Sequence, residues 1–203
     1  MNNHLKENSW LLTIPFIAGI IIISFSCSRD STPSASYPSQ LPASTPESIN
    51  TIDSPDFVQA IVTRVVDGDT VKVKFDDNSA DTVRILGIDT PETHATNKPY
   101  EYGEITNLDC LNAWGDQATE FAFNTLYKRE VILESDPSAP ERGYFDRLLA
   151  YVRINEQDFG SLLLEKGFAR VYEEGESSRK KEYLQLEAKA KDAEIGLWGC
   201  DSN

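Results

Sequence analysis

Two acidic residues stand on either side of a Thr-Pro pair where an apolar segment ends. The segment reads ILGIDTPETH from Ile85, so that Thr90 and Pro91 separate Asp89 from Glu92. Because proline fixes its own backbone φ, the two carboxylates are held at a defined angle. An ordinary turn explains the stretch equally well when it is considered alone, since Asp and Pro are both common turn residues.

Other polar residues fall at the ends of neighbouring segments, and together they suggest a metal site. Asp69 follows an Asp-Gly turn, Arg84 precedes Asp89 within one apolar segment, and Arg147 opens a later one. A hard divalent cation such as Ca²⁺ prefers oxygen ligands. Asp69, Asp89 and the backbone carbonyl of Thr90 provide such ligands if the two segments are neighbours in the fold.

The remaining members of this set suit the hydrolysis of a phosphodiester. Glu92 would lie near the cation without binding it, where a general base that aligns a water molecule is needed. Arg84 and Arg147 carry forked, permanently charged groups that grip the non-bridging oxygens as charge builds in the transition state. Each residue taken singly has a plainer role, as a turn acid, a solvated cation or a salt-bridge partner.

Five β-rich segments must position these residues. The first three, within residues 57–89, are separated by turn signals and predict an antiparallel meander, because Val71, Val73 and Phe75 alternate with polar residues. REVILE and RLLAYVRI predict two more strands. Helical patterns cover residues 114–126, 159–166 and 178–193. This mainly β chain with α elements is typical of a five-stranded OB-fold barrel with three helices, although the pattern alone leaves the topology open.

The first part of the chain predicts export. Lys6 precedes an apolar run over residues 10–25, and Cys27 follows a serine, so residues 1–27 are expected to be a signal peptide or lipoprotein leader. A lipid on Cys27, simple cleavage and a retained N-terminal helix as a membrane tether all stay open. Residues 28–53, rich in Ser, Thr and Pro, predict a disordered linker. Residues 54–203 then form the folded domain.

Cysteine content and charge set two further bounds. Cys110 and Cys200 are the only cysteines of the folded part, and in an oxidising compartment they predict one disulfide, with two buried thiols as the alternative. The net charge of −14 opposes long-range attraction to polyanions, since that attraction comes from Lys and Arg. Phosphate chemistry in this chain must therefore depend on a local arrangement.

The motifs VVDGDTVKV, VRILGIDTPETH, YFDRLLAYV, LLLEKGFARVY and GLW occur in this order between residues 57 and 198. In this the chain resembles the thermonuclease family typified by staphylococcal nuclease. The resemblance implies the same barrel with three helices, and hydrolysis of DNA and RNA. It also implies that Ca²⁺ is held by Asp69, Asp89 and Thr90, and that catalysis uses Arg84, Glu92 and Arg147.

The chain departs from the family pattern beside the second catalytic arginine. Phe145 and Asp146 stand where the typifying enzyme has tyrosine and glycine. A phenol that would reach phosphate is missing, unless Tyr144 or Tyr172 replaces it, and Asp146 adds a negative charge. We expect weaker turnover or a changed substrate preference. This chain is also less basic than the enzyme that typifies the family, which favours short or single-stranded substrates over tight duplex binding.

These features predict a secreted or surface-tethered, Ca²⁺-dependent endonuclease with little sequence preference. It is expected to be extracellular or at the cell surface, monomeric, and without a small-molecule cofactor. One alternative is an OB-fold module that has lost its chemistry and binds single strands or a protein. Another is a tethered structural domain of a surface lipoprotein, which only the linker and Cys27 support.

Overall fold

The computed structural model describes residues 56–200. The predicted leader, residues 1–27, and the predicted linker, residues 28–53, lie outside the described residues. No helix within the described part of the chain is both long and apolar enough to cross a membrane.

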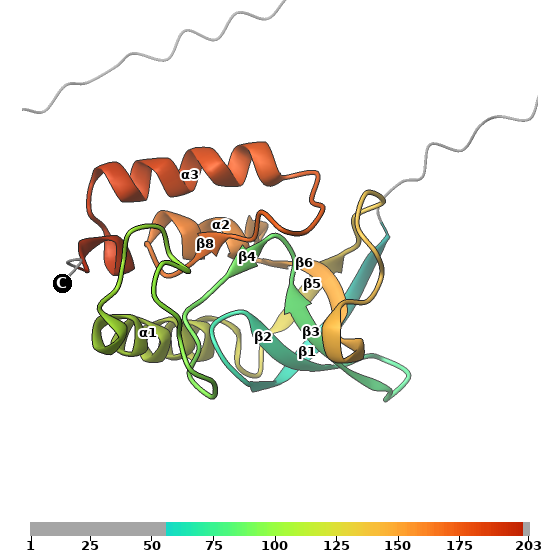
Figure 1. Ribbon diagram of the computed structural model, residues 1–203. Coiled ribbons are helices and arrows are strands. Elements are labelled where there is room, and N and C mark those ends of the chain that lie inside the picture. The colour runs from blue at the N-terminus through green and yellow to red at the C-terminus, as the bar shows by residue number, and fades with distance from the viewer. Residues whose placement is uncertain (1–55, 201–203) are drawn as a thin grey trace, which may run out of the picture. The chain divides into compact units, whose positions relative to one another are not determined.

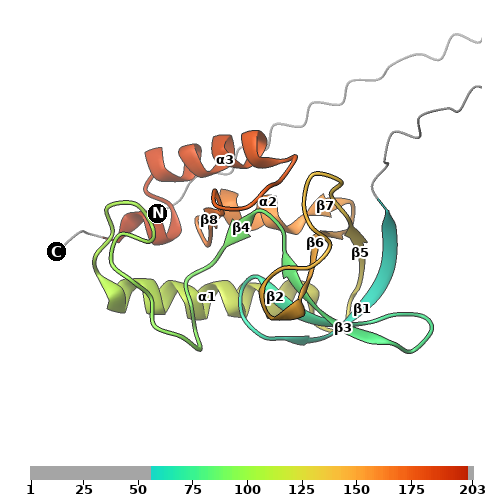
Figure 2. The same cartoon turned by 45° about the vertical axis from the view of Figure 1, so that its right-hand side comes forward.

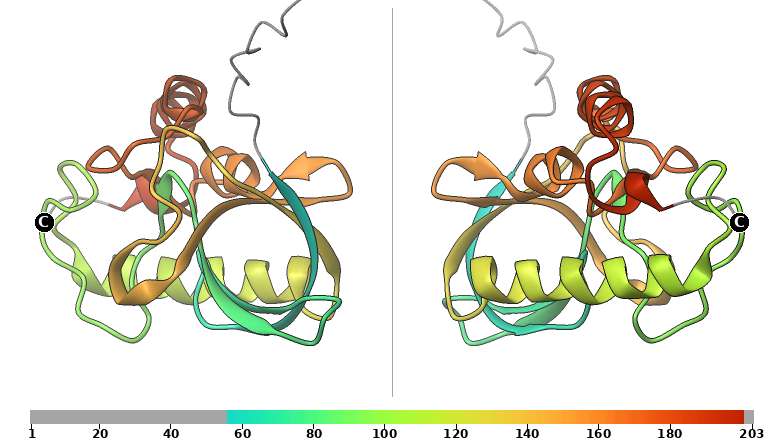
Figure 3. Two further views of the ribbon diagram at one scale, coloured as in Figure 1. Left: turned by 90° about the vertical axis from the view of Figure 1, so that its right-hand side faces the viewer. Right: turned by 90° about the vertical axis from the view of Figure 1, so that its left-hand side faces the viewer.

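Five strands close into a barrel, as the sequence predicts (Figures 1 and 3). The first three form the predicted antiparallel meander, and the order β3-β2-β1-β5-β6 closes through a parallel pairing of β3 with β6. Among residues 56–200, the short strand β7 pairs with β6 alone. The strands are β1 Phe57–Val65, β2 Thr70–Lys74, β3 Ala80–Ile85, β5 Glu130–Glu134, β6 Leu148–Ile154 and β7 Gln157–Asp158.

Three α-helices pack around the barrel, which confirms the predicted fold class. Two-residue strands β4 and β8, which the sequence pattern does not predict, pair with each other and lie side by side (Figure 2). Helix α1 begins at Leu108 rather than at Trp114, where the prediction placed its start. The elements are α1 Leu108–Leu126, α2 Phe159–Glu165, α3 Lys180–Asp192, β4 Ile88–Asp89, β8 Arg170–Val171, and the short 3₁₀ helices η1 Tyr144–Asp146 and η2 Gly196–Gly199.

The barrel core follows from the alternation of apolar and polar residues. Val71, Val73 and Val83 point inward and are fully buried. Ala122 and Leu126, on one face of α1, are buried in the same cluster. Burial of each valine or leucine side chain stabilises the fold by about 1.5–3 kcal/mol relative to exposure. The same alternation places the intervening polar residues of the meander on the outside.

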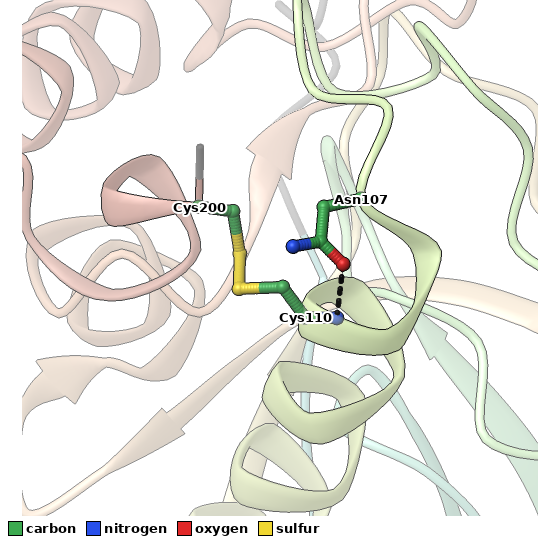
Figure 4. The surroundings of a disulfide bond; sticks show 3 residues. All are labelled: Asn107, Cys110 and Cys200. Carbon is green, nitrogen blue, oxygen red and sulfur yellow. Dashed lines mark hydrogen bonds between the residues drawn. A yellow bond between two sulfur atoms is a disulfide. The ribbon is translucent and has the colours of Figure 1, made fainter. Parts of the chain in front are cut away.

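A smaller apolar cluster joins the start of α1 to the C-terminal end of the described chain. Tyr102, Ile105, Leu111 and Leu197 are buried in it. A disulfide links Cys110 to Cys200 across this cluster, with Cα atoms 5.9 Å apart (Figure 4). The predicted disulfide is thus confirmed, and the alternative of two buried thiols is wrong.

A buried carboxylate connects the segment before α3 to the barrel. Asp136 accepts hydrogen bonds from the Tyr151 hydroxyl at 2.5 Å and from the Ser178 backbone N–H at 2.6 Å. It also accepts from the backbone N–H and hydroxyl of Ser138, at 2.9 and 2.7 Å. Burial alone would raise the pKa of Asp136, but these hydrogen bonds outweigh burial and hold the pKa well below its ordinary value of 3.8.

Replacement of Asp136 by asparagine should therefore lower stability in a pH-dependent way. Because the folded-state pKa lies below the unfolded-state pKa, the carboxylate stabilises the fold above about pH 4 and loses this contribution as the pH falls. Urea unfolding near neutral pH should show a loss of about 1–3 kcal/mol in Asp136→Asn. At about pH 3 the difference from wild type should shrink.

Asp77→Asn is the matched control for this prediction. The hydrogen bonds from Ser79 also lower the pKa of Asp77, but this carboxylate lies in an exposed turn. Its replacement should change the unfolding free energy far less. A loss in Asp136→Asn that stays the same at both pH values would contradict the assigned role of the carboxylate.

Candidate active site

The turn before β2 places the Asp69 carboxylate against the end of β4. Asp69 is 2% exposed, and its Oδ2 accepts hydrogen bonds from the Thr90 backbone N–H at 2.8 Å and the Thr90 hydroxyl at 3.1 Å. Close approach at this point depends on Gly68, because a Cβ there would lie 2.9 Å from the Thr90 side chain and 2.8 Å from that of Ala118. The hairpin and the strand end are therefore neighbours, as the metal-site prediction requires.

Arg84 joins the two predicted metal carboxylates. It is the last residue but one of β3 and pairs in register with Thr70, beside Asp69. Its Nη1 forms an ion pair with Asp69, and its Nη2 donates to Asp89 Oδ1 at 2.5 Å. Since one guanidinium contacts both acids, the two carboxylates converge on a common point.

The second oxygen of Asp89 is held by an arginine that the sequence analysis did not single out. Pairing of β4 with β8 sets Asp89 opposite Arg170, whose Nε and Nη2 each lie 3.0 Å from Asp89 Oδ2. Arg170 also pairs with Glu174 at 3.2 Å. The only sequence signal for this contact was the position of Arg170 within the motif LLLEKGFARVY, because a two-residue strand leaves no periodic pattern.

Glu92 extends from a backbone segment that is firmly held. Its N–H donates to Asn97 Oδ1 at 2.8 Å, and Asn97 Nδ2 donates back to its carbonyl at 3.1 Å. Gly115 of α1 permits this path, because a Cβ there would lie 2.7 Å from the Pro91 carbonyl oxygen. Partial burial, followed by the negative charges of Asp67 and Asp89, raises the pKa of Glu92. A carboxylate with a raised pKa is a better proton acceptor.

Arg147 follows η1 and reaches back to the same region. Its Nε donates to the Tyr144 carbonyl at 3.1 Å and its Nη1 to the Thr70 hydroxyl at 3.4 Å. Burial, and then the positive charge of Arg84, lowers the pKa of Arg147. Within residues 56–200 its guanidinium forms no ion pair with a carboxylate, which leaves its charge available to an anion.

A cavity of about 600 Å³ opens beside the two arginines. Arg84, Arg147, Tyr144 and Tyr172 are among its lining residues, whereas Asp69, Asp89 and Glu92 are not. Both tyrosines proposed as replacements for the missing phenol thus border the cavity.

The two residues that depart from the family pattern lie outside the ion-pair network of the site. Phe145 is 92% exposed, and Arg147 Cζ lies 5.5 Å from the centre of its ring. Asp146 Oδ1 lies 3.8 Å from Arg142 Nε and is therefore directed toward Arg142. The Asp146 carboxylate thus pairs with Arg142 and not with the predicted catalytic residue Arg147.

The donor chemistry of the site fits a hard divalent cation. Asp69, Asp89 and Thr90 bring two carboxylates and a carbonyl to adjoining chain segments, and all three residues are buried. Within the described residues, no group of three or more acidic, histidine or cysteine side chains is arranged to hold a metal ion. A cation here would thus need a backbone carbonyl and water to complete its oxygen shell.

His94 and Tyr102, which lie on the chain after the DTPE motif, make contacts away from the predicted site residues. The Nε2 atom of His94 lies 3.1 Å from the Val66 carbonyl oxygen. Tyr102 is buried in the smaller cluster at 1% exposure, and so packs rather than binds a base.

Comparison with known proteins identifies relatives of the chain. The family model described as "Staphylococcal nuclease homologue" matches residues 82–200. An uncharacterized protein of Methanocaldococcus jannaschii is 38% identical over 161 residues, which are 75% of this chain and 77% of the relative. The SPbeta prophage-derived endonuclease YokF of Bacillus subtilis is 32% identical over 70% of this chain and 45% of its own length. The thermonuclease of Staphylococcus hyicus is 34% identical over 54% of this chain and 57% of its own.

Proposed function

Since the chain belongs to the family of staphylococcal nuclease homologues, we propose that it is a Ca²⁺-dependent endonuclease that hydrolyses phosphodiester bonds of DNA, RNA or both with little sequence preference. The observation that carries the proposal is the contact of one arginine, Arg84, with both Asp69 and Asp89. It supports a single site built where the start of β2 and the ends of β3 and β4 meet.

Asp69, Asp89 and the carbonyl of Thr90 would hold the cation. When bound, Ca²⁺ supplies charge that neutralises phosphoryl oxygens and polarises a coordinated water molecule. Asp89 is oriented for this role from both sides, by Arg84 on one oxygen and Arg170 on the other. Groups that support a ligand in this way commonly affect metal affinity 10- to 100-fold.

The other site residues act on the water and the phosphate. Glu92 accepts the proton of the attacking water, a role that its raised pKa supports. Arg84 and Arg147 stabilise the charge that develops on the non-bridging oxygens, with Arg147 free of competing carboxylates among the described residues.

Cleavage of a single-stranded oligonucleotide, with Ca²⁺ and with excess chelator, tests the proposal. We expect cleavage by the purified protein with Ca²⁺ and its loss with chelator. Binding without cleavage would favour the alternative of a catalytically silent OB-fold module. If the protein neither binds nor cleaves the oligonucleotide, only the structural role at the cell surface remains.

We further propose that the protein is exported and is secreted or tethered at the cell surface. The apolar N-terminal segment, Cys27 and the Ser/Thr/Pro-rich stretch after it support this, as does the Cys110–Cys200 disulfide, because such bonds persist mainly in oxidising compartments. The mass of the mature protein measures whether the leader is removed, lipidated or retained.

A further inference from the structure

The outer surface of the first hairpin carries an unusual group of cations. Arg64 on β1 and Lys72 and Lys74 on β2 are all exposed. We call these three residues the basic strip. The chain has 33 acidic and 19 basic residues, yet no acidic residue lies between these three cations on the two strands.

The basic strip is not arranged for stability. Arg64 lies directly opposite Lys72 in the β1–β2 register, and like charges in such a cross-strand pair are destabilising. None of the three cations forms an ion pair with any residue between 56 and 200. Their charges are therefore uncompensated on the surface of the domain.

The basic strip leads directly away from the candidate active site. Residues two apart on a strand share a face, so Lys72 and Lys74, which are exposed, lie on the same face of β2 as Thr70, which is buried at the site. Thr70 pairs with Arg84 on β3 and accepts a hydrogen bond from Arg147, so the line of cations begins at the two catalytic arginines. From Thr70 to Lys74, four residues along β2, the strand rises by about 13 Å.

We propose that the basic strip binds the phosphate backbone of a substrate strand beyond the scissile phosphate. This inference rests on the proposed nuclease function and adds an extended substrate path to it. A length of about 13 Å suits a run of only a few nucleotides of one strand. Asp76 and Asp77, which follow β2 after Phe75, set the end of this path, because their charges repel phosphate.

A nucleic-acid strand fits the basic strip better than an anionic lipid surface does. The cations form a narrow line that is continuous with arginines placed to hold a phosphodiester, whereas a membrane would meet a broad face. The line also explains how a chain of net charge −14 holds a polyanion, since the attraction is confined to one track.

The test compares two double variants that remove the same charge. Lys72→Gln with Lys74→Gln neutralises the basic strip, and Lys181→Gln with Lys189→Gln neutralises two exposed lysines of α3. Figures 1 and 3 show α3 on the opposite side of the domain from β2. Binding of a fluorescent single strand of about a dozen nucleotides is measured in chelator, which prevents cleavage, over a range of salt concentrations.

We expect the strip variant to bind the strand at least about tenfold more weakly than wild type, and its plot of log affinity against log salt to lose about 1.4 from its slope. The α3 variant should keep the slope of wild type. Thermal unfolding of the strip variant should occur at the wild-type temperature or above it, because a like-charge pair is removed.

Each other outcome contradicts the proposal in a distinguishable way. If wild type neither binds nor cleaves the strand, the nuclease function fails together with the basic strip. If wild type binds and cleaves but the strip variant shows the same affinity and slope, only the basic strip fails. If the strip variant loses binding to anionic lipid vesicles while it keeps strand binding, the surface serves a membrane instead.

Discussion

Replacement of Arg147 by alanine is expected to lower kcat/KM on nucleic acid by about 10²–10³-fold, the usual effect of removing one group that stabilises transition-state charge. The expectation follows from the position of this guanidinium. It lies beside Arg84 and the carboxylates, yet it forms no ion pair with any described residue. Its hydrogen bonds, to the Tyr144 carbonyl and the Thr70 hydroxyl, leave most of its donors for a phosphate.

Arg142→Ala is the matched control for this prediction. Arg142 lines the same cavity, but its guanidinium is held by Asp81 at 2.7 Å and by the Asp146 carbonyl at 2.6 Å. Its loss should lower kcat/KM far less than the loss of Arg147. Steady-state kinetics of both variants measure this difference, and circular dichroism checks that both are folded. Equal effects of the two substitutions would contradict the role of Arg147.

Replacement of Glu92 by glutamine is expected to lower kcat by about 10²–10⁴-fold, the range for loss of a general base. Glutamine keeps the shape of the side chain but cannot accept the proton of the attacking water. The backbone of Glu92 is held by Asn97, whose side chain is buried, so the substitution should leave the local structure in place. KM and the affinity for Ca²⁺ should change little.

Glu101→Gln separates this effect from a general change of charge. Glu101 is close enough to Glu92 to raise its pKa, but its carboxylate accepts a hydrogen bond from the backbone of Lys98. Its substitution removes the same charge and should leave kcat near that of wild type. A Glu92→Gln variant that cleaves at the wild-type rate, or that loses Ca²⁺ binding, would show that Glu92 is not the base.

The parts of the fold with a clear local period could be predicted from the sequence. Alternation around Val71 and Val73 identified the meander, because one face of each strand is buried in the barrel. The start of α1 was missed because Leu108, Cys110 and Leu111 pack in the smaller cluster, which depends on residues near Cys200. Barrel closure through the parallel β3–β6 pairing is likewise a long-range contact without a local signal.

The candidate site was predictable where its residues stand in motifs, and obscure where tertiary contacts create the environment. The motifs DGDT and DTPE led to Asp69, Asp89 and Glu92. The pairing of β4 with β8, which brings Arg170 to Asp89, rests on strands of two residues each and has no detectable period. The alternation in the sequence places Lys72 and Lys74 on one face of a strand, but only the β1–β2 register shows that Arg64 lies beside them.

The central claim is that Asp69 and Asp89 hold one cation at a single phosphodiesterase site. Calorimetric titration of Ca²⁺ onto the purified protein tests it most directly, with Asp89→Asn as the variant and Asp116→Asn, an exposed residue of α1, as the control for charge. We expect one Ca²⁺ site per chain, with an affinity that is unchanged in the control. In Asp89→Asn the affinity should fall at least about tenfold, because even groups that only support a metal ligand have an effect of that size. Absence of binding to the wild-type protein, or equal affinity in Asp89→Asn, would contradict it.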